Sequence, residues 1–388
     1  RLFHHGSLCL CLRPGGDGWS GGVLSRELTM LYTAYVRGAA SPLPELPIQY
    51  ADYAVWQRQQ LDDAASAAQL AYWQQQLAGL PPLLELPVDH PRPPVQSFCG
   101  ALHRFECSLA LAQKLKALGN RCQTTPFMTG LTAFAILLAR YSRTDDIVIG
   151  TLIANRNRPE LEELVGFFAN TLVLRADLSG EPTVLELLAR VRRMTLEAFD
   201  HQELPFEKLV EELRPERSLS FNPIFQVLFT WQQNSTLASV DLPGLTIIPL
   251  DIHTGTAKFD LHLNVCDSPS GGLKGELEYN TDLFDAATIT RMAGHLQVLL
   301  EGMVADPEMP VSKLNLLTAN EERQLRVNSN DSQATFAHDK CLHQLFAEQA
   351  ACTPDAIAVV YEDQVLQYGE LNRRANQLAH YLQARGVG

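Results

Sequence analysis

The chain carries three short motifs in succession: Val165-Gly-Phe-Phe-Ala-Asn-Thr-Leu172, His201-Gln-Glu-Leu-Pro-Phe-Glu207 and Arg217-Ser-Leu-Ser-Phe-Asn-Pro223. A fourth motif, Tyr50-Ala-Asp-Tyr-Ala-Val-Trp56, precedes them. One seven-residue match to a known pattern is weak evidence, whereas four matches in a fixed order over roughly 170 residues are specific. These motifs therefore decide how the rest of the chain is interpreted.

The composition excludes several classes of protein. The chain has 388 residues, of which 46% are apolar, so it exceeds one typical domain and can bury large cores. Its net charge of -13 argues against a nucleic-acid-binding surface, which needs clustered Lys and Arg. Apolar stretches such as residues 127–139 are shorter than the roughly 20 residues of a membrane helix. The eight cysteines form no C-x-x-C pair and follow no signal peptide, so we expect a reduced cytoplasm.

Residue periodicity predicts an α/β architecture. Apolar residues at three- and four-residue spacing predict helices, and strand-like runs separate them. The predicted helices are 19–38, 51–79, 109–121, one opened by Thr125-Pro126, 182–199 with Pro182 in its first turn, and 285–303. The predicted strands are 8–12, 101–107, 146–152, 225–231, 245–252, 259–266 and 273–279. Strand, helices and strand in succession indicate an α/β layer with a crossover, and the last strands favour antiparallel hairpins.

The four motifs closely resemble the ordered core motifs of the condensation domain of nonribosomal peptide synthetases, over roughly residues 8–315. The resemblance implies a two-lobe α/β fold like that of chloramphenicol acetyltransferase. The proline-rich segment 81–94, expected to be rigid and extended, resembles the link between the two lobes. The chain has no initiator Met and enters directly on the apolar run 8–12, so we expect the N-terminal lobe to be truncated.

The last fifty residues resemble a different family. Cys341-Leu-His-Gln-Leu-Phe346, Thr353-Pro-Asp-Ala-Ile-Ala-Val359 and Leu366-Gln-Tyr-Gly-Glu-Leu371 are similar to the opening of an adenylation domain. We therefore expect a partial condensation domain at 1–315, a linker at 316–340 and the start of an adenylation domain at 341–388. In that family the nucleotide-binding loop and the catalytic lysine come later, so the resemblance implies that this segment cannot adenylate by itself.

The resemblance implies amide formation between two carrier-tethered groups. The amine of one aminoacyl group attacks the thioester carbonyl of another, and the enzyme mainly aligns the two substrates and steadies the tetrahedral intermediate. No cofactor or metal is expected to bind directly, because the substrates ride on the phosphopantetheine of partner carrier domains. The implied partners are upstream and downstream peptidyl carrier domains and the adjoining adenylation domain, with no nucleic acid or membrane.

The family places a His-His-x-x-x-Asp-Gly motif at the centre of its substrate tunnel, and this chain matches only the second half. Asp17 and Gly18, followed by Trp19, fit the pattern and are the candidate catalytic-motif residues. Counting back from Asp17 places Leu12 and Arg13 where the two histidines belong. Arg13 cannot act as a base, because a guanidinium stays protonated at any useful pH.

Three interpretations of this mismatch remain open. A histidine pair exists at His4 and His5, but an extended run separates it from Asp17, which disfavours its looping into place. A degenerate, inactive site is the second interpretation. An insertion or frameshift that altered residues 1–16 ranks first, because the match resumes abruptly at Asp17.

The remaining motif residues are predicted to support the site. The resemblance implies that Asp17 is buried and paired with Arg156, with Arg158 as the alternative partner. A solvated turn for Asp17 and a surface basic cluster for the arginines are the competing interpretations. Asn170 and Thr171 either end a strand or belong to a bridging region near the active channel.

The other candidate residues are predicted to be structural or to lack a catalytic setting. His201 is expected to be structural, at a helix-to-loop corner where Pro205 fixes the turn and Phe206 lies in the core. Asn222 and Pro223 are expected to shape the acceptor side. The histidines 253, 262 and 295 lack metal-ligand spacing. Residue 20, a serine, lacks a base in a nucleophile-elbow setting, which disfavours an acyl-enzyme.

Other functions compete with peptide bond formation. A related epimerisation domain would not lead directly into an adenylation start. The run 167–174 together with Asp17-Gly-Trp-Ser20 looks most like the subtype that joins two L-residues. A degenerate, non-catalytic condensation-like domain that acts as a binding platform is an alternative that Arg13 suits. A nonfunctional gene fragment is another.

Overall fold

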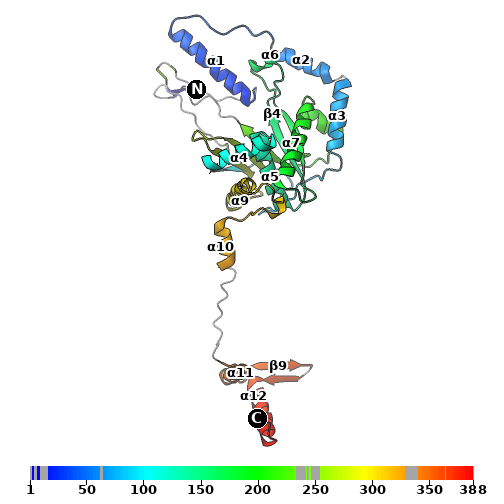
Figure 1. Cartoon of the computed structure of the whole chain (residues 1–388), viewed down its shortest axis with the longest axis vertical. Helices are drawn as coiled ribbons and strands as arrows, with labels where there is room; N and C mark the ends of the chain where they lie inside the picture. The colour runs from blue at the N-terminus through cyan, green and yellow to red at the C-terminus, as the bar shows by residue number, and fades with distance from the viewer. Residues whose placement is uncertain are drawn as a thin grey trace. The chain divides into compact units, whose positions relative to one another are not determined.

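The computed structural model describes residues 2–3, 7–8, 16–61, 64–232, 242, 244–245, 254–327, 340–362 and 364–387. By contacts the chain divides into two compact units, Arg1–Glu322 and Arg323–Gly388 (Figure 1). The predictions on His4, His5, Leu12 and Arg13 lie outside the described residues, as do most of those on strands 8–12 and 245–252.

A six-stranded mixed sheet forms the centre of the first unit. Its strands are β3 (Gly100–Cys107), β4 (Asp146–Ile153), β5 (Asn170–Asp177), β6 (Val227–Gln232), β7 (Leu261–Asp267) and β8 (Leu273–Asn280). They lie in the order β3-β8-β7-β6-β4-β5. β4, β6 and β7 run parallel, and the other neighbours are antiparallel. Two short strands, β1 (Leu2–Phe3) and β2 (Ser7–Leu8), pair with each other.

The predicted antiparallel hairpin is confirmed for β7 and β8, and any hairpin with the predicted strand 245–252 lies mostly outside the described residues. β7 and β8 are antiparallel neighbours joined at residues 268–272, as expected. β6 and β7 pair in parallel, with Trp231 opposite Val265. The connection from 233 to 260 is long enough for the crossover that a parallel pair needs, whereas a hairpin turn uses only a few residues. Alternation within each strand could not reveal this direction.

The first three helices of the first unit come before the strands of the sheet in the sequence, and the other helices lie between or after these strands in the sequence. They are α1 (Gly18–Val36), α2 (Tyr50–Leu61), α3 (Ala64–Gln76), α4 (Leu109–Cys122), α5 (Pro126–Ser142), α6 (Pro159–Glu162), α7 (Val184–Asp200), α8 (Phe206–Leu213) and α9 (Ala286–Ala305). A further helix, α10 (Ala319–Val327), crosses the division between the two units. A 3-10 turn spans Val311–Lys313. The predicted helix 51–79 is thus divided into α2 and α3.

Local capping explains where two of the helices begin. Thr125 caps α5 by accepting the N–H of Met128, and the fixed backbone of Pro126 suits the first turn. Thr183 and Glu186 form a capping box at α7. The prediction that Pro182 lies in the first turn of α7 is therefore wrong, because the cap follows it.

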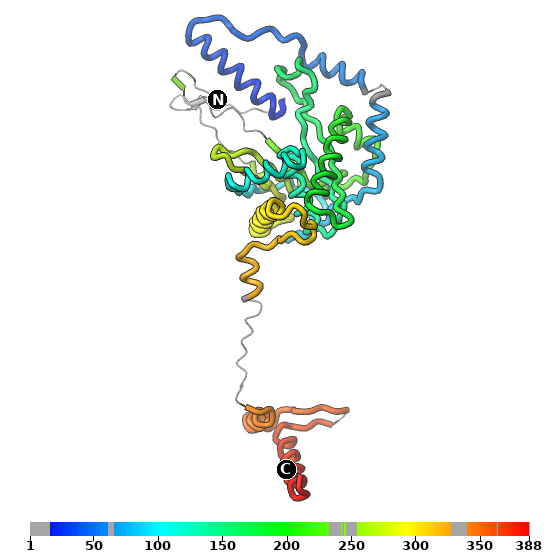
Figure 2. The backbone as a smooth tube through the Cα atoms, in the orientation of Figure 1, coloured from blue at the N-terminus to red at the C-terminus, as the bar shows by residue number. Residues whose placement is uncertain are grey.

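The core lies between the sheet and one layer of helices. α5 contacts β4, β6, α7 and α9 (Figure 2). Its side chains 131–138 are buried. The fully buried rings of Phe134 and Phe229 pack 6.0 Å apart at its centre. Among the described residues, no single helix is long and apolar enough to span a membrane. The one pair that reaches that length together, α4 and α5, is bent by 102°.

The second unit is small. It contains α11 (Leu342–Cys352), β9 (Ile357–Tyr361), β10 (Gln364–Gln367) and α12 (Tyr368–Ala384). β9 and β10 form an antiparallel pair, and α12 contacts both strands and α11. The predicted linker, residues 316–340, includes α10 and spans the division between the units.

Candidate functional site

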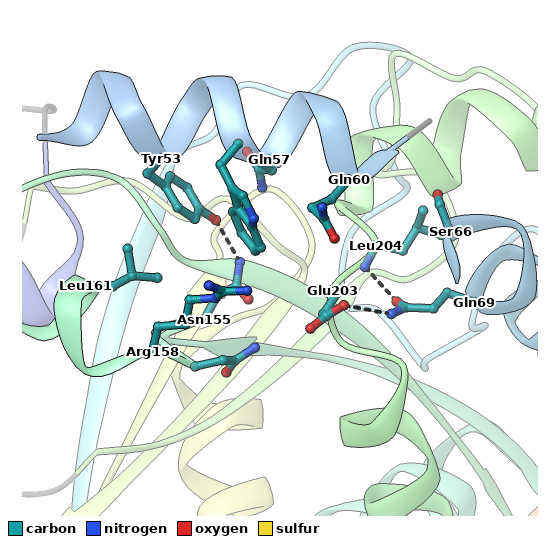
Figure 3. A pocket seen from close by; sticks show the side chains of 12 residues that line it. Tyr53, Gln57, Gln60, Ser66, Gln69, Asn155, Arg158, Leu161, Glu203 and Leu204 are labelled. Atoms are coloured by element: carbon teal, nitrogen blue, oxygen red, sulfur yellow. Dashed lines mark hydrogen bonds between the residues drawn. The ribbon is translucent and has the colours of Figure 1, made fainter. Parts of the chain in front are cut away.

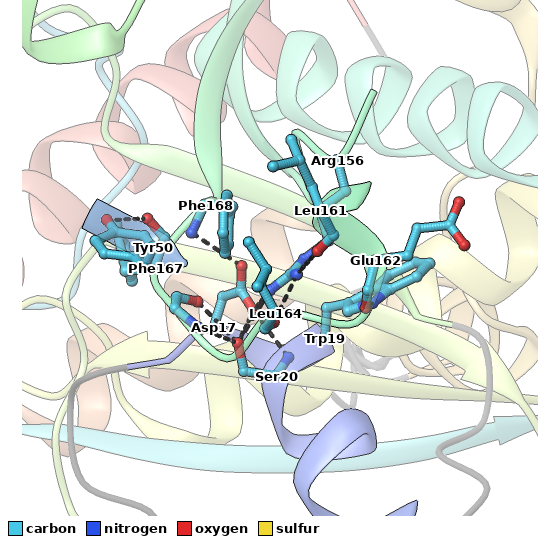
Figure 4. A network of polar contacts seen from close by, with 11 residues as sticks. Asp17, Trp19, Ser20, Tyr50, Arg156, Leu161, Glu162, Leu164, Phe167 and Phe168 are labelled. Atoms are coloured by element: carbon cyan, nitrogen blue, oxygen red, sulfur yellow. Dashed lines mark hydrogen bonds and ion pairs between the residues drawn. The ribbon is translucent and has the colours of Figure 1, made fainter. Parts of the chain in front are cut away.

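Asp17 lies at the N-terminus of α1 and organises the chain around it (Figure 4). It is the N-cap residue, and its Oδ1 accepts the N–H of Ser20 at 2.9 Å. Its Oδ2 accepts the N–H of Phe168 at 3.1 Å, from the segment that leads into β5. The carboxylate therefore joins the start of α1 to the connection between β4 and β5. This excludes the interpretation of Asp17 as a solvated turn residue, because its side chain is 5% exposed.

Arg156, in the loop after β4, is the cation of this network. Its Nη2 lies 3.1 Å from Asp17 Oδ1, and its side chain is 1% exposed. Its Nη1 donates to the carbonyl oxygens of Leu161 and Leu164. The guanidinium also lies 4.1 Å from the centre of the Phe168 ring. The structure thus brings Asp17 and Arg156 together and excludes a surface position for Arg156.

Ser20 closes the network. Its hydroxyl accepts from Arg156 Nη2 at 3.0 Å and from the N–H of Gly166 at 3.1 Å. It lies 2.8 Å from both Asp17 Oδ1 and the Gly166 carbonyl, either of which can accept its proton. Gly166 must lack a side chain, because a Cβ there would lie 2.2 Å from Tyr50 Cδ2. Sequence reasoning weighed Ser20 only as a nucleophile and missed this positioning role.

The network controls the charge of Asp17. Burial alone would raise the pKa of this carboxyl group. The hydrogen bonds from Ser20 and Phe168 and the positive charge of Arg156 outweigh burial, and the pKa lies below its ordinary value of 3.8. Asp17 is therefore an anion at neutral pH and cannot supply a proton to a reaction.

This lowered pKa predicts a pH-dependent contribution to stability. A carboxyl group whose pKa is lower in the folded state stabilises the fold above its unfolded pKa, and the contribution is lost as pH falls through the folded pKa. We expect Asp17→Asn to destabilise the first unit at pH 7, with the difference from wild type shrinking below about pH 4. Urea titrations at pH 7, 5, 4 and 3 would measure it, with the exposed Glu160→Gln as control. A difference that stayed constant with pH would contradict the assignment.

A polar pocket adjoins this network, and we call it the motif pocket (Figure 3). It encloses about 300 Å³. Two of the four sequence motifs, 50–56 and 201–207, contribute lining residues, together with the loop after β4 and Leu161 of α6. Its lining residues are Tyr53, Trp56, Gln57, Gln60, Ser66, Gln69, Asn155, Asn157, Arg158, Leu161, Glu203 and Leu204. Segments separated by about 150 residues along the sequence thus build one concave site.

Side chains with fixed partners shape the motif pocket. Asn155 Nδ2 donates to the Tyr53 hydroxyl at 3.4 Å. The Arg158 guanidinium lies 4.5 Å from the centre of the Trp56 ring. Arg158 therefore stacks on an aromatic side chain at the pocket and does not join the Asp17 network. Gln69 accepts the N–H of Leu204 at 2.9 Å and fixes the far wall.

Asn170, the first residue of β5, holds the corner beside the motif pocket. Its Nδ2 donates to the carbonyl oxygens of Gln202 and Leu204, each at 2.9 Å. Its Oδ1 accepts the N–H groups of Thr171 and Phe206, at 2.9 and 3.0 Å. Asn170 thus begins a strand and does not end one. Its side chain satisfies four backbone groups of the surrounding corner.

The remaining predicted residues occupy structural positions. His201 is the C-cap residue of α7, and its ring stacks on that of Tyr72 with centroids 3.8 Å apart. Pro205 is the N-cap residue of α8, and Phe206 packs against the core. Asn222 Nδ2 donates to the Lys258 carbonyl at 2.6 Å, next to Pro223.

Gly18 and Trp19, which belong to the predicted catalytic motif, are not enclosed by neighbouring residues. A Cβ on Gly18 would meet nothing within 4 Å. Trp19 is 47% exposed, and its Nε1 donates to the Glu162 carbonyl at 2.9 Å. Within the described residues, only Asp17 of this motif is thus held by many contacts.

Two histidines outside the motifs have protein partners. His295 is buried between the Tyr141 hydroxyl at 2.8 Å and Glu321 at 3.0 Å. His262 contacts the Thr230 hydroxyl at 2.8 Å, and burial lowers its pKa to about 4. In the part of the chain that the structure describes, no group of three or more His, Cys, Asp or Glu is placed to hold a metal ion.

Comparisons with known families match both units. A family model described as "Condensation domain" matches residues 16–326. A second, described as "AMP-binding enzyme", matches residues 346–388. The first match includes Asp17, Arg156 and every motif that meets at the motif pocket.

Relatives and a solved structure give the same assignment. Malpinin synthetase of Mortierella alpina is 48% identical over 371 residues, which are 96% of this chain and 5% of that protein. A linear gramicidin synthase subunit from Brevibacillus parabrevis is 47% identical over 374 residues, 96% of this chain and 7% of that protein. The crystal structure of the X-domain from teicoplanin biosynthesis superposes with a TM-score of 0.70 at 30% identity, covering 78% of this chain and 70% of that one. The chain thus spans a small fraction of the length of these synthetases.

Proposed function

The chain belongs to the condensation-domain family of nonribosomal peptide synthetases, and from this premise we propose that its first unit forms amide bonds between carrier-tethered groups. The amine of the acceptor aminoacyl group attacks the thioester carbonyl of the donor. A C–N bond forms, the C–S bond breaks, the donor carrier leaves as a thiol, and the amine loses one proton.

The buried Asp17–Arg156 pair is the observation that carries this proposal. It ties the N-terminus of α1 to the loops at residues 161–168, directly after the segment where the family carries its histidine pair. A thioester is already activated, so holding two substrates in line accounts for much of the rate. A rigid anchor beside the reacting segment suits that task.

The proposed partners are carrier domains on both sides and the adenylation domain that begins in the second unit. The match of residues 346–388 to an AMP-binding enzyme supports the last of these. The substrates would ride on the phosphopantetheine of the carriers, and we propose no cofactor of the chain itself. The reaction would take place in the cytoplasm.

We also propose that the two joined residues have the L configuration. The support is the run 167–174 together with the segment that follows Asp17. A donor carrier loaded with an L-aminoacyl group should give product faster than the same carrier loaded with its D-enantiomer. Equal rates would contradict the subtype and leave amide formation standing.

A binding platform without catalysis is the second candidate. The likeness to an X-domain and the residue types at positions 12 and 13 favour it. Such a platform would need the same rigid fold and would not need a base. The two candidates therefore differ in turnover and not in structure.

A reconstituted assay separates them. Loaded donor and acceptor carriers are mixed with the chain, and the dipeptide on the acceptor is measured by mass spectrometry. We expect product above the rate without protein. Because a general base typically contributes about 10²–10⁴-fold, we expect Leu12→His/Arg13→His to raise that rate by at least tenfold. No product from either protein, with unfolding curves unchanged, would support the platform.

A further inference from the structure

A second cavity lies inside the first unit, and we call it the α4 cavity. It encloses about 510 Å³ between α4, α5, α9 and the sheet. Its floor is one row of neighbouring residues across four strands: Phe105, Gly275, Val265 and Trp231. Trp231 and Val265 lie near the carboxyl ends of the parallel strands β6 and β7. Ligands of open α/β sheets commonly bind beyond such strand ends.

The helix geometry and the residue sizes explain why this space is open. α4 and α5 are bent by 102° relative to each other, and α4 packs mainly on the helices α5, α7 and α9, whereas α5 packs on β4 and β6 of the sheet. The helix side chains that line the wedge include Ala112 and Ala133, which are too small to fill it. Protein interiors contain few voids larger than a water molecule, whereas small-molecule sites typically enclose about 300–1,000 Å³. The α4 cavity has the size of a binding site.

The lining is mostly apolar and includes a smaller number of polar residues. Leu115, Leu263, Leu273, Leu296 and Leu300 contribute to the apolar wall. Cys107 belongs to the same wall, and burial raises the pKa of its thiol to about 11, so it stays uncharged. The polar lining residues are Gln113, Lys116, Asn120, Thr124, Thr129 and Asp267, of which Lys116 and Asp267 are charged and exposed. The arrangement suits a molecule with an apolar body and one polar end.

We propose that the α4 cavity binds one apolar chain of a small molecule, an aliphatic or arylalkyl group whose polar end remains beside Lys116 and Asp267. Such an apolar chain has two possible sources: the acyl group of a carrier-tethered substrate and a free fatty acid. Binding of the free chain does not depend on amide formation, so the inference stands apart from the proposed function.

Decanoate is the probe, titrated into the full 388-residue chain. Ala112→Phe places a ring in the cavity, and Ala110→Phe places the same ring on an exposed position of α4 outside the lining. We expect decanoate to bind wild type and Ala110→Phe equally, and Ala112→Phe at least tenfold more weakly. Unfolding midpoints of both variants near that of wild type would show that the fold is kept. Equal binding by Ala112→Phe, or no binding of decanoate by wild type, would overturn the proposal.

A second arm identifies the source. Donor carriers loaded with decanoyl or acetyl groups are compared in the reconstituted assay. A preference for decanoyl that Ala112→Phe removes, while acetyl transfer is kept, assigns the cavity to the substrate. Lost decanoate binding without any change in acyl preference assigns it to a free fatty acid. Failure of all transfer would contradict the proposed function and leave the binding result intact.

Discussion

Replacing Arg156 by alanine is expected to lower the free energy of unfolding of the first unit by about 3–5 kcal/mol. The substitution leaves the Asp17 carboxylate, whose side chain is 5% exposed, without its cation. It also removes donors from the carbonyl oxygens of Leu161 and Leu164. A buried charge that loses its partner costs far more than the loss of an exposed pair.

Tryptophan fluorescence in urea would measure this change cleanly. The chain has four tryptophans, and Trp19, Trp56, Trp73 and Trp231 all lie in the unit Arg1–Glu322. Unfolding of the second unit therefore does not contribute to the signal. Because the slope with denaturant follows the surface exposed, an unchanged slope with a lower midpoint would indicate a true loss of stability.

Two variants serve as matched controls. Arg158→Ala removes an exposed guanidinium that stacks on Trp56, so we expect a loss below about 1 kcal/mol in the free energy of unfolding. Arg156→Lys keeps the charge but loses the planar fork that reaches Asp17, Ser20 and two carbonyl oxygens at once. We expect the free energy of unfolding of Arg156→Lys to lie near that of Arg156→Ala. If the free energy of unfolding fell no more in Arg156→Ala than in Arg158→Ala, the Asp17–Arg156 network would not contribute to stability as expected.

Much of the fold was predictable because most elements have a local cause. The Thr125-Pro126 pair marks the start of α5, and the apolar spacing of 184–191 matches the buried face of α7. The four motifs predicted the condensation-domain family and its α/β fold, which the family match and the superposition confirm. The parallel pairing of β6 and β7 was not predictable, because the alternation of residues within one strand is compatible with either direction of its neighbour.

The candidate site was predictable only where a motif named the residues. Asp17 and Arg156 were singled out by resemblance, and the structure brings them together. Of the two arginines of the same loop, the resemblance ranked Arg156 first and Arg158 second, but the spacing of the residues alone gave no physical reason for that order. Arg156 is buried, while Arg158 points to Trp56 at the motif pocket. Spacing of two residues in an irregular loop does not fix a direction, so only the fold decides between them.

The motif pocket itself was not predicted. Gln69 and Glu203 line it and contact each other at 3.3 Å across 134 residues of sequence. Neither has a charge partner or metal spacing that single-sequence reasoning could detect. The same holds for Ser20, whose hydroxyl binds groups of the β4–β5 connection. Long-range polar contacts of this kind cannot be predicted from the sequence, because they depend on how the folded chain brings distant residues together.

Replacing Asn170 by alanine is the second substitution with a large expected effect. The Asn170 side chain makes four hydrogen bonds to backbone groups at residue 171 and around residues 202–206, and the residue is 7% exposed. Each buried group left without a partner costs about 1–3 kcal/mol. We expect a loss of about 2–4 kcal/mol, since water can reach some of these groups. Asn170→Asp should cost at least as much, because a carboxylate cannot donate to the Gln202 and Leu204 carbonyls.

The consequence should extend to the motif pocket, because Leu204 and Glu203 line it and Asn170 fixes their backbone. Asn157→Ala is the matched control, since Asn157 is exposed at the same pocket. We expect the free energy of unfolding of that control to lie within about 0.5 kcal/mol of the wild-type value. Hydrogen exchange would show the local effect: the amide of Phe206 should lose protection in Asn170→Ala and keep it in Asn157→Ala. Unchanged protection of that amide would mean that Asn170 does not hold the corner, and the wall at Leu204 would then depend on the hydrogen bond to Gln69 instead.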